Sequence, residues 1–297
     1  MTGLSPAEVS SQHACAAAPA GYARCEAQVL VARSSGARVH PSIQGGRPLA
    51  QVQPALSSAL ASPQAVPAQP PPQPGTPAYL QQAYDLSYLS ATNGGSDTIA
   101  VVDAFEDPTA ERDLATFRSK YGLPDCTTAN GCFRKANQSG GSSPPAGRDS
   151  GWEMEEAMDV DAVSALCPKC RILLVEANSA RMTDLATAVQ TAAGMGANQL
   201  SLSWSSPPAT GIPGTYTFPG VATIAAAGDS GYLGISGDSY PAAYAGVTAA
   251  GGTTLASTSS ASQRGYDESA WSGAGSGCDL SQTKPSYQAD VGCAGRA

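Results

Sequence analysis

Residues 153–204 read EMEEAMDVDAVSALCPKCRILLVEANSARMTDLATAVQTAAGMGANQLSLSW, and their pattern gives the clearest indication of the class of fold. The pattern predicts a helix over 153–166 that ends before a proline, followed by a strand over 171–175 in the apolar run RILLV. A threonine-capped helix is predicted over 183–193, where glycines end it, and QLSLSW predicts a strand over 199–204. Helix and strand therefore alternate along the chain.

The same alternation continues on both sides of this stretch. TIAVV predicts a strand over 98–102, and Thr109 caps a helix after it. VATIAAA at 221–227 and GVTAA at 246–250 are two more runs that look buried. Strands that are apolar on both faces and alternate with helices are typical of parallel sheets. The sequence therefore predicts an α/β fold, with a mostly parallel sheet and helices on both of its faces.

Composition excludes several classes of function. The chain has 297 residues, and 42% of them are hydrophobic, which is enough for a sizeable core. Lys plus Arg total 16 against 24 Asp plus Glu, so the net charge is -8, and charged residues make up 13%. Because this balance offers no basic surface, we expect no nucleic-acid partner and no membrane partner. No apolar run reaches the roughly 18 residues that a membrane-spanning helix needs.

The expected domain boundaries follow changes in composition. Residues 1–61 are rich in Ala and Ser and are interpreted as a leader or the remnant of a pro-region. Residues 62–77, SPQAVPAQPPPQPGTP, predict an extended Pro-rich linker, so the globular domain is expected over 78–297. Both histidines, His13 and His40, precede the linker. Chemistry in the domain is therefore expected to proceed without imidazole.

Eight cysteines fall into four close couples. An even count in short loops favours disulfides formed in an oxidising compartment, and hence a secreted protein, although the start of the chain lacks the pattern of a signal peptide. A four-thiolate zinc site is the alternative for the two central couples, and a redox motif is a third interpretation of the Cys-Pro-Lys-Cys sequence. The couples are Cys15 with Cys25, Cys126 with Cys132, Cys167 with Cys170, and Cys278 with Cys293.

Polar residues follow the predicted strands at the edge where α/β sheets bind their ligands. Asp103 ends the first strand, and Ser203 and Trp204 end the third. The predicted helix carries Glu155 and Asp159, which are four residues apart and therefore share one face. Two carboxylates this close tend to share a proton, as a base and its orienting partner do in mildly acidic conditions. A solvated acidic helix is the alternative interpretation.

The tetrapeptide GDSG at 228–231 is like the nucleophile segment of chymotrypsin-like proteases. Those enzymes are all-β and use a histidine base, whereas this domain is α/β and has no histidine. Ser230 is therefore not assigned as a nucleophile, and the motif is interpreted as a turn. The loop after Asp103 lacks the glycines of a phosphate-binding loop, so no nucleotide cofactor is expected.

The order and spacing of several segments from about Tyr79 onward carry more information than any segment alone. They are AYDL and then DTIAVVDAF at 97–105, W-x-x-E-x-x-x-D-V-D with SALCPKCRILLVEA at 152–177, SLSW at 201–204, AAAGDSG at 225–231, YPAAY and VTAAGGTTL at 240–255, and W-S-G-A-G-S-G-C with KPSYQ at 271–288. In this arrangement they resemble the sedolisin family of serine-carboxyl peptidases. The resemblance implies a subtilisin-like three-layer fold and a secreted endopeptidase that acts on peptide or protein substrates at acid pH.

The resemblance also assigns roles to individual residues. By the match around the tryptophan and the Cys-Pro step, Glu155 takes the place of subtilisin's histidine as general base, and Asp159 orients it one helical turn later. The AAAGDSG match places Asp229 in the oxyanion hole, where its carboxyl group must be protonated to donate a hydrogen bond. Ser203 and Trp204 match the strand that lines the substrate cleft.

The family's nucleophile motif, Gly-Thr-Ser, does not occur in this sequence, and Gly252-Thr253-Thr254 belongs to the GGTTL strand segment instead. We therefore expect the N-terminal two-thirds of a peptidase domain, truncated at its C-terminus and inactive as given. No metal ligands or cofactors are assigned in this chain; calcium is expected only in a full-length family member, and the protein is expected to be a monomer. Asp103 is interpreted as structural. The alternative function is a noncatalytic domain that binds peptides by strand addition along Ser203 and Trp204.

Overall fold

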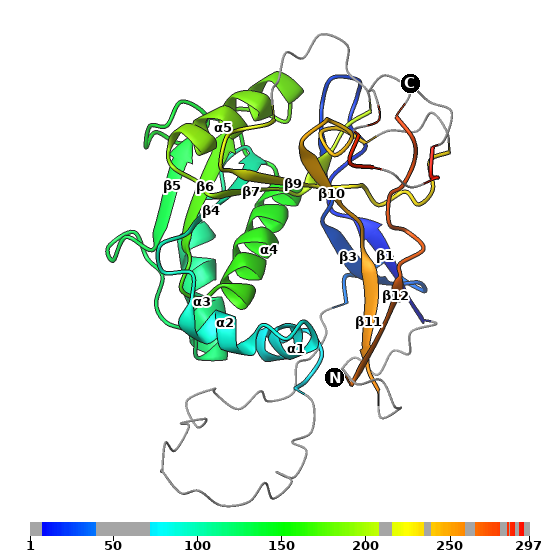
Figure 1. Cartoon of the computed structure of the whole chain (residues 1–297), viewed down its shortest axis with the longest axis horizontal. Coiled ribbons are helices and arrows are strands. Elements are labelled where there is room, and N and C mark those ends of the chain that lie inside the picture. The colour runs from blue at the N-terminus through cyan, green and yellow to red at the C-terminus, as the bar shows by residue number, and fades with distance from the viewer. Residues whose placement is uncertain are drawn as a thin grey trace, which may run out of the picture.

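A computed structural model of the chain (Figure 1) describes residues 8–39, 72–207, 216–234, 239–258, 265–279, 284, 286–288 and 291–293. His40 and most of the predicted linker lie outside these ranges. Within them, none of the helices is both long enough and apolar enough to cross a bilayer.

The centre of the molecule is a sheet of six strands in the order β10-β9-β7-β4-β6-β5, and all neighbouring strands are parallel. Its strands are β4 (Thr98–Ala104), β5 (Phe133–Asn137), β6 (Arg171–Ala177), β7 (Gln199–Leu202), β9 (Ala222–Ala226) and β10 (Val247–Ala250). The predicted α/β fold with a parallel sheet is confirmed. Because β4 lies between β6 and β7, the end of β4 is surrounded by the ends of other strands.

Two details of the sheet differ from the sequence-based prediction. The edge strand β5 was not predicted, because its sequence FRKAN buries only Phe133 and Ala136 and so lacks a continuous apolar run. The predicted strand over 199–204 is interrupted at Ser203. The chain leaves the sheet there, and Trp204–Ser205 forms a short separate strand, β8.

Helices cover both faces of the sheet (Figure 1). Successive residues of a strand point to opposite faces, and in β4 Val101 packs with α3 and α4 whereas Val102 packs with α5. This gives the three layers of the predicted subtilisin-like fold. The helices are α1 (Pro77–Ala83), α2 (Ser87–Thr92), α3 (Ala110–Tyr121), α4 (Ser150–Leu166) and α5 (Met182–Gly194).

The N-terminal segment, residues 8–39, packs into the core of the sheet domain. Its strands are β1 (Val9–His13), β2 (Arg24–Cys25) and β3 (Gln28–Ala32). β1 pairs antiparallel with β3, and β2 pairs antiparallel with β8. Ala23, Cys25 and Ala27 are buried in the same cluster as the sheet residues. The packed core therefore includes residues that precede the expected domain boundary at residue 78. The first helix, α1, begins at Pro77.

A second hairpin follows the sheet, with strands β11 (Thr253–Ser257) and β12 (Tyr266–Ala270). It packs on α1, where Tyr79 and Tyr266 meet edge to face with their ring centroids 5.1 Å apart. Thr253 and Thr254 lie in β11, as the GGTTL pattern predicts.

All four predicted cysteine couples form disulfides, and none of the eight cysteines is free. Cysteines joined in disulfides have no thiolate to offer a metal, so the zinc interpretation of the central couples is wrong. Cys15–Cys25 links the bend that follows β1 to β2 and so ties the two parts of the N-terminal segment together.

Candidate active site

The residues singled out from the sequence gather at the carboxyl edge of the sheet, meaning the edge where its parallel strands end. Asp103 lies near the end of β4, Ser203 directly follows β7, and Asp229 lies in the turn after β9. α4 packs against β4 and β6. The parallel topology brings together side chains that are far apart in the sequence.

Glu155 and Asp159 point from α4 into the protein. Glu155 is 2% exposed, and its Oε2 accepts a hydrogen bond from the backbone N–H of Ala27. Asp159 is partly buried, and its Oδ1 accepts a hydrogen bond of 2.7 Å from the Ser203 hydroxyl. The alternative of a solvated acidic helix is therefore wrong for this face of α4.

Burial sets the protonation of this pair. Loss of water raises the pKa of Glu155, and the neighbouring Asp159 raises it further. Burial also raises the pKa of Asp159, although the Ser203 hydroxyl opposes this effect by stabilising the carboxylate. When two neighbouring carboxyl groups both have raised pKa values, the state in which they share one proton is more stable than the state in which both are ionised.

Asp103 is a third carboxyl group of the same cluster. It is fully buried, and neither of its side-chain oxygens has a hydrogen-bond partner. Burial raises the pKa of Asp103 well above its usual range, and the charges of Asp159 and Glu155 add to this effect. The side chain therefore belongs to the electrostatics of the site, close to the two residues expected to be catalytic.

Trp204 has its indole in the core. Its side chain is completely buried, and Nε1–H donates a 2.8 Å hydrogen bond to the carbonyl oxygen of Val102. The backbone of Ser203 and β8 pairs with the N-terminal segment. Cys25 is the register partner of Trp204, and the N–H of Glu26 donates to the carbonyl oxygen of Ser203 at 3.1 Å. An extended segment thus pairs with β8 as a neighbouring strand, and the buried Trp204 indole holds β8 against the sheet through its bond to Val102.

Asp229 lies in a turn that requires glycine on both sides. Gly228 and Gly231 have φ angles of 95° and 68°, in the left-handed region that side chains disfavour. This geometry explains GDSG as a turn and leaves Ser230 exposed. The side-chain amide of Gln28 donates a hydrogen bond to Asp229 Oδ2.

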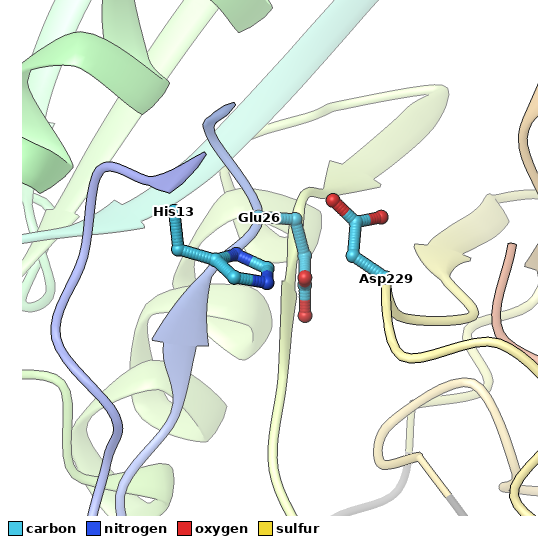
Figure 2. Close-up of side chains that lie close together, drawn as sticks. All are labelled: His13, Glu26 and Asp229. Atoms are coloured by element: carbon cyan, nitrogen blue, oxygen red, sulfur yellow. The ribbon is translucent and has the colours of Figure 1, made fainter. Parts of the chain in front are cut away.

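The position of the N-terminal segment beside these residues was not predicted from the sequence. His13 and Glu26 lie beside Asp229, with one potential metal-ligand atom from each residue within 4.8 Å of the others (Figure 2). Both histidines precede the linker and were expected to take no part in the chemistry of the domain, yet His13 lies beside Asp229. Burial lowers the pKa of His13, and burial raises the pKa of Glu26. The Cys15–Cys25 couple was the one sequence feature that indicated an ordered N-terminal segment, because a disulfide there restrains the neighbouring residues His13 and Glu26.

No nucleophile contacts the expected base in the described part of the chain. There, Glu155 accepts a hydrogen bond only from Ala27. The hydroxyls of Ser203 and Ser205 donate to Asp159 and Glu26.

Comparisons with known proteins support the fold. No protein-family model and no curated protein matches the chain. Among solved structures, the chain is similar to Pseudomonas sedolisin, a serine-carboxyl proteinase complexed with two molecules of pseudo-iodotyrostatin. The TM-score is 0.56 at 20% identity, over 75% of this chain and 67% of that one.

Two other protease structures are less similar. A mutant protease domain of PatA gives a TM-score of 0.34 at 19% identity, over 53% of this chain and 58% of that one. The epidermin leader peptide processing serine protease EpiP of Staphylococcus aureus gives 0.34 at 16% identity, over 58% and 52%. The chain thus has the subtilisin-like α/β fold of sedolisin and spans about two-thirds of that protein's length.

Proposed function

We propose that this chain is part of a secreted serine-carboxyl endopeptidase that hydrolyses peptide bonds in acid. The observation that supports this most directly is the group of buried carboxyls, Glu155 with Asp159 and Asp103, at the carboxyl edge of a sedolisin-type sheet. A buried pair of acids with raised pKa values is costly to maintain, and such pairs concentrate at sites that move protons.

In the proposed reaction Glu155, as a carboxylate, takes the proton of a serine hydroxyl while the serine oxygen attacks the peptide carbonyl carbon. Asp159 holds Glu155 in position and shares its charge. Asp229, protonated, donates a hydrogen bond to the oxyanion that forms. Glu155 then returns its proton to the departing amine as the C–N bond breaks, and water hydrolyses the acyl-serine in the same way.

The substrate would bind as an extended strand along β8. The pairing of Arg24 and Cys25 with Ser205 and Trp204 supports this proposal, because it is backbone pairing of the kind that a peptide can make without a particular sequence. Ser203 would contribute through its carbonyl oxygen and through its hydroxyl bond to Asp159.

The serine nucleophile is not assigned to any residue of 1–297, because no Gly-Thr-Ser tripeptide occurs there. We propose that the chain as given is inactive, and that calcium binds only in a longer form. The four disulfides and the net charge of -8 support a secreted monomer without nucleic-acid or membrane partners. A noncatalytic peptide-binding domain is the second candidate, favoured by the same strand pairing at β8.

The test uses a longer form of the protein that carries the Gly-Thr-Ser segment. Glu155→Gln and Asp159→Asn are each expected to abolish hydrolysis of a denatured protein substrate, with near-ultraviolet circular dichroism unchanged. Glu153→Gln is the matched control, because Glu153 lies on the same helix but pairs at the surface with Arg148 at 2.7 Å. Activity within a few-fold of the parent in Glu155→Gln would favour the noncatalytic alternative or a different base.

A further inference from the structure

A histidine and two carboxylates meet where the N-terminal segment touches the turn after β9 (Figure 2). His13 is the last residue of β1, Glu26 directly follows β2, and Asp229 lies in the GDSG turn. Figure 2 shows the imidazole ring and the Glu26 carboxylate side by side, with the Asp229 carboxylate next to them. One potential ligand atom from each residue lies within 4.8 Å of the other two.

Two of these side chains have buried polar atoms without hydrogen-bond partners. The Glu26 side chain is 7% exposed; Ser205 donates to its Oε1, but its Oε2 has no hydrogen bond. The nearest cation to Oε2 is a guanidinium nitrogen of Arg24, at 4.0 Å. His13 Nδ1 is also shielded from solvent and unpaired. Buried polar atoms are rarely left unpaired, so these two indicate a missing partner.

The three residues are held in place by contacts of the protein itself. The Cys15–Cys25 disulfide links the segments that carry His13 and Glu26. His13 is also the register partner of Gln28, whose amide binds Asp229. A site that is formed in advance loses little conformational entropy when an ion enters.

We propose that His13, Glu26 and Asp229 bind a divalent transition-metal ion, of which zinc is the best match. One imidazole nitrogen with two carboxylate oxygens is a donor set that zinc accepts, whereas calcium and magnesium favour sites with more oxygen ligands. In a tetrahedral zinc site, ligand atoms lie roughly 3.4 Å apart, so atoms that now lie within 4.8 Å of one another need to approach by at most about 1.4 Å. Three protein ligands leave the fourth position open to water.

The consequence for activity rests on the proposed function. A bound ion would hold Asp229 as an ionised ligand, and an ionised carboxylate cannot donate a hydrogen bond to an oxyanion. The same ion would tie the N-terminal segment to the turn and keep Ala27 against Glu155. The metal-bound form would therefore be inactive.

The binding test needs no catalytic activity and uses the full chain of 297 residues. Isothermal titration with zinc chloride at neutral pH is expected to show one ion per chain. His13→Gln and Glu26→Gln should each weaken binding roughly tenfold or more, because each removes one of three ligands. His40→Gln is the matched control, since it removes the only other histidine, and it should bind zinc like the parent. Calcium chloride and magnesium chloride should give no comparable binding.

Two results would overturn the proposal: no zinc binding at about 100 µM zinc, or equal binding by the parent and His13→Gln. Cobalt chloride provides a second measurement, because a four-coordinate Co²⁺ site absorbs strongly in the visible range and Glu26→Gln should abolish that band. Near-ultraviolet circular dichroism checks that both variants fold. The two proposals can fail independently. Zinc binding tests the metal site alone, whereas loss of hydrolysis in Glu155→Gln tests the proposed function alone.

Discussion

Replacement of Asp103 by Asn tests one electrostatic claim about the site, that the carboxyl group of Asp103 is protonated in the folded protein. Asp103 is fully buried with no hydrogen-bond partner for either oxygen, and burial raises its pKa well above the usual range. Above about pH 4 the unfolded chain releases this proton while the folded chain keeps it. The contribution of Asp103 to the free energy of unfolding is therefore full below about pH 4 and falls as the pH rises toward the folded-state pKa.

The size of the effect follows from proton linkage. One retained proton makes the free energy of unfolding fall by about 1.4 kcal/mol per pH unit, over the range in which the folded chain keeps the proton and the unfolded chain has lost it. Asp103→Asn removes that proton and should remove that part of the slope. Asn has nearly the same shape, so packing around the site is conserved.

Urea denaturation at a series of pH values, followed by tryptophan fluorescence, measures this slope. Trp152 and Trp204 are both buried and should report the loss of the fold. Asp267→Asn is the matched control, because Asp267 is exposed and its carboxyl group stays in water in both states. If Asp103→Asn has the same slope as the parent, Asp103 is ionised when folded and the electrostatic account of the site is wrong.

Two further predictions concern the N-terminal segment and the pH of activity. Replacing Cys15 and Cys25 together by Ser should lower the free energy of unfolding by about 3 kcal/mol, because the bridge closes a short loop; the same urea titration measures it, and an unchanged midpoint would contradict it. A longer form with the serine nucleophile should hydrolyse protein faster in acid than at neutral pH, because Asp229 donates only when protonated and the Glu155/Asp159 pair titrates as a unit. A rate profile that is flat from acid to neutrality would count against this role of Asp229.

Much of the fold could be predicted from local patterns. The strands β4 and β6 are continuous apolar runs, and α4 and α5 end at the proline and glycine signals that the sequence displays. The edge strand β5 could not be predicted, because an edge strand exposes polar side chains and loses the apolar signal of a buried strand.

The candidate site was predictable only in part. The spacing of Glu155 and Asp159 places them on one helix face, but spacing does not say whether that face meets water or protein. The burial of Glu155 and the bond from Ser203 to Asp159 decide this, and both depend on how α4 lies across the sheet.

The class of fold and the pairing of the cysteines could be predicted from the sequence, because periodicity and loop length act over short distances along the chain. The roles of the candidate acids came from the resemblance to the sedolisin family. Only the tertiary structure brought the N-terminal segment into the site. The bond from Ala27 to Glu155 spans 128 residues, and the bond from Gln28 to Asp229 spans 201. Such contacts form because β2 pairs with β8 and the sheet gathers its strand ends at one edge. No local pattern carries that information, since it depends on which surfaces the whole chain buries together.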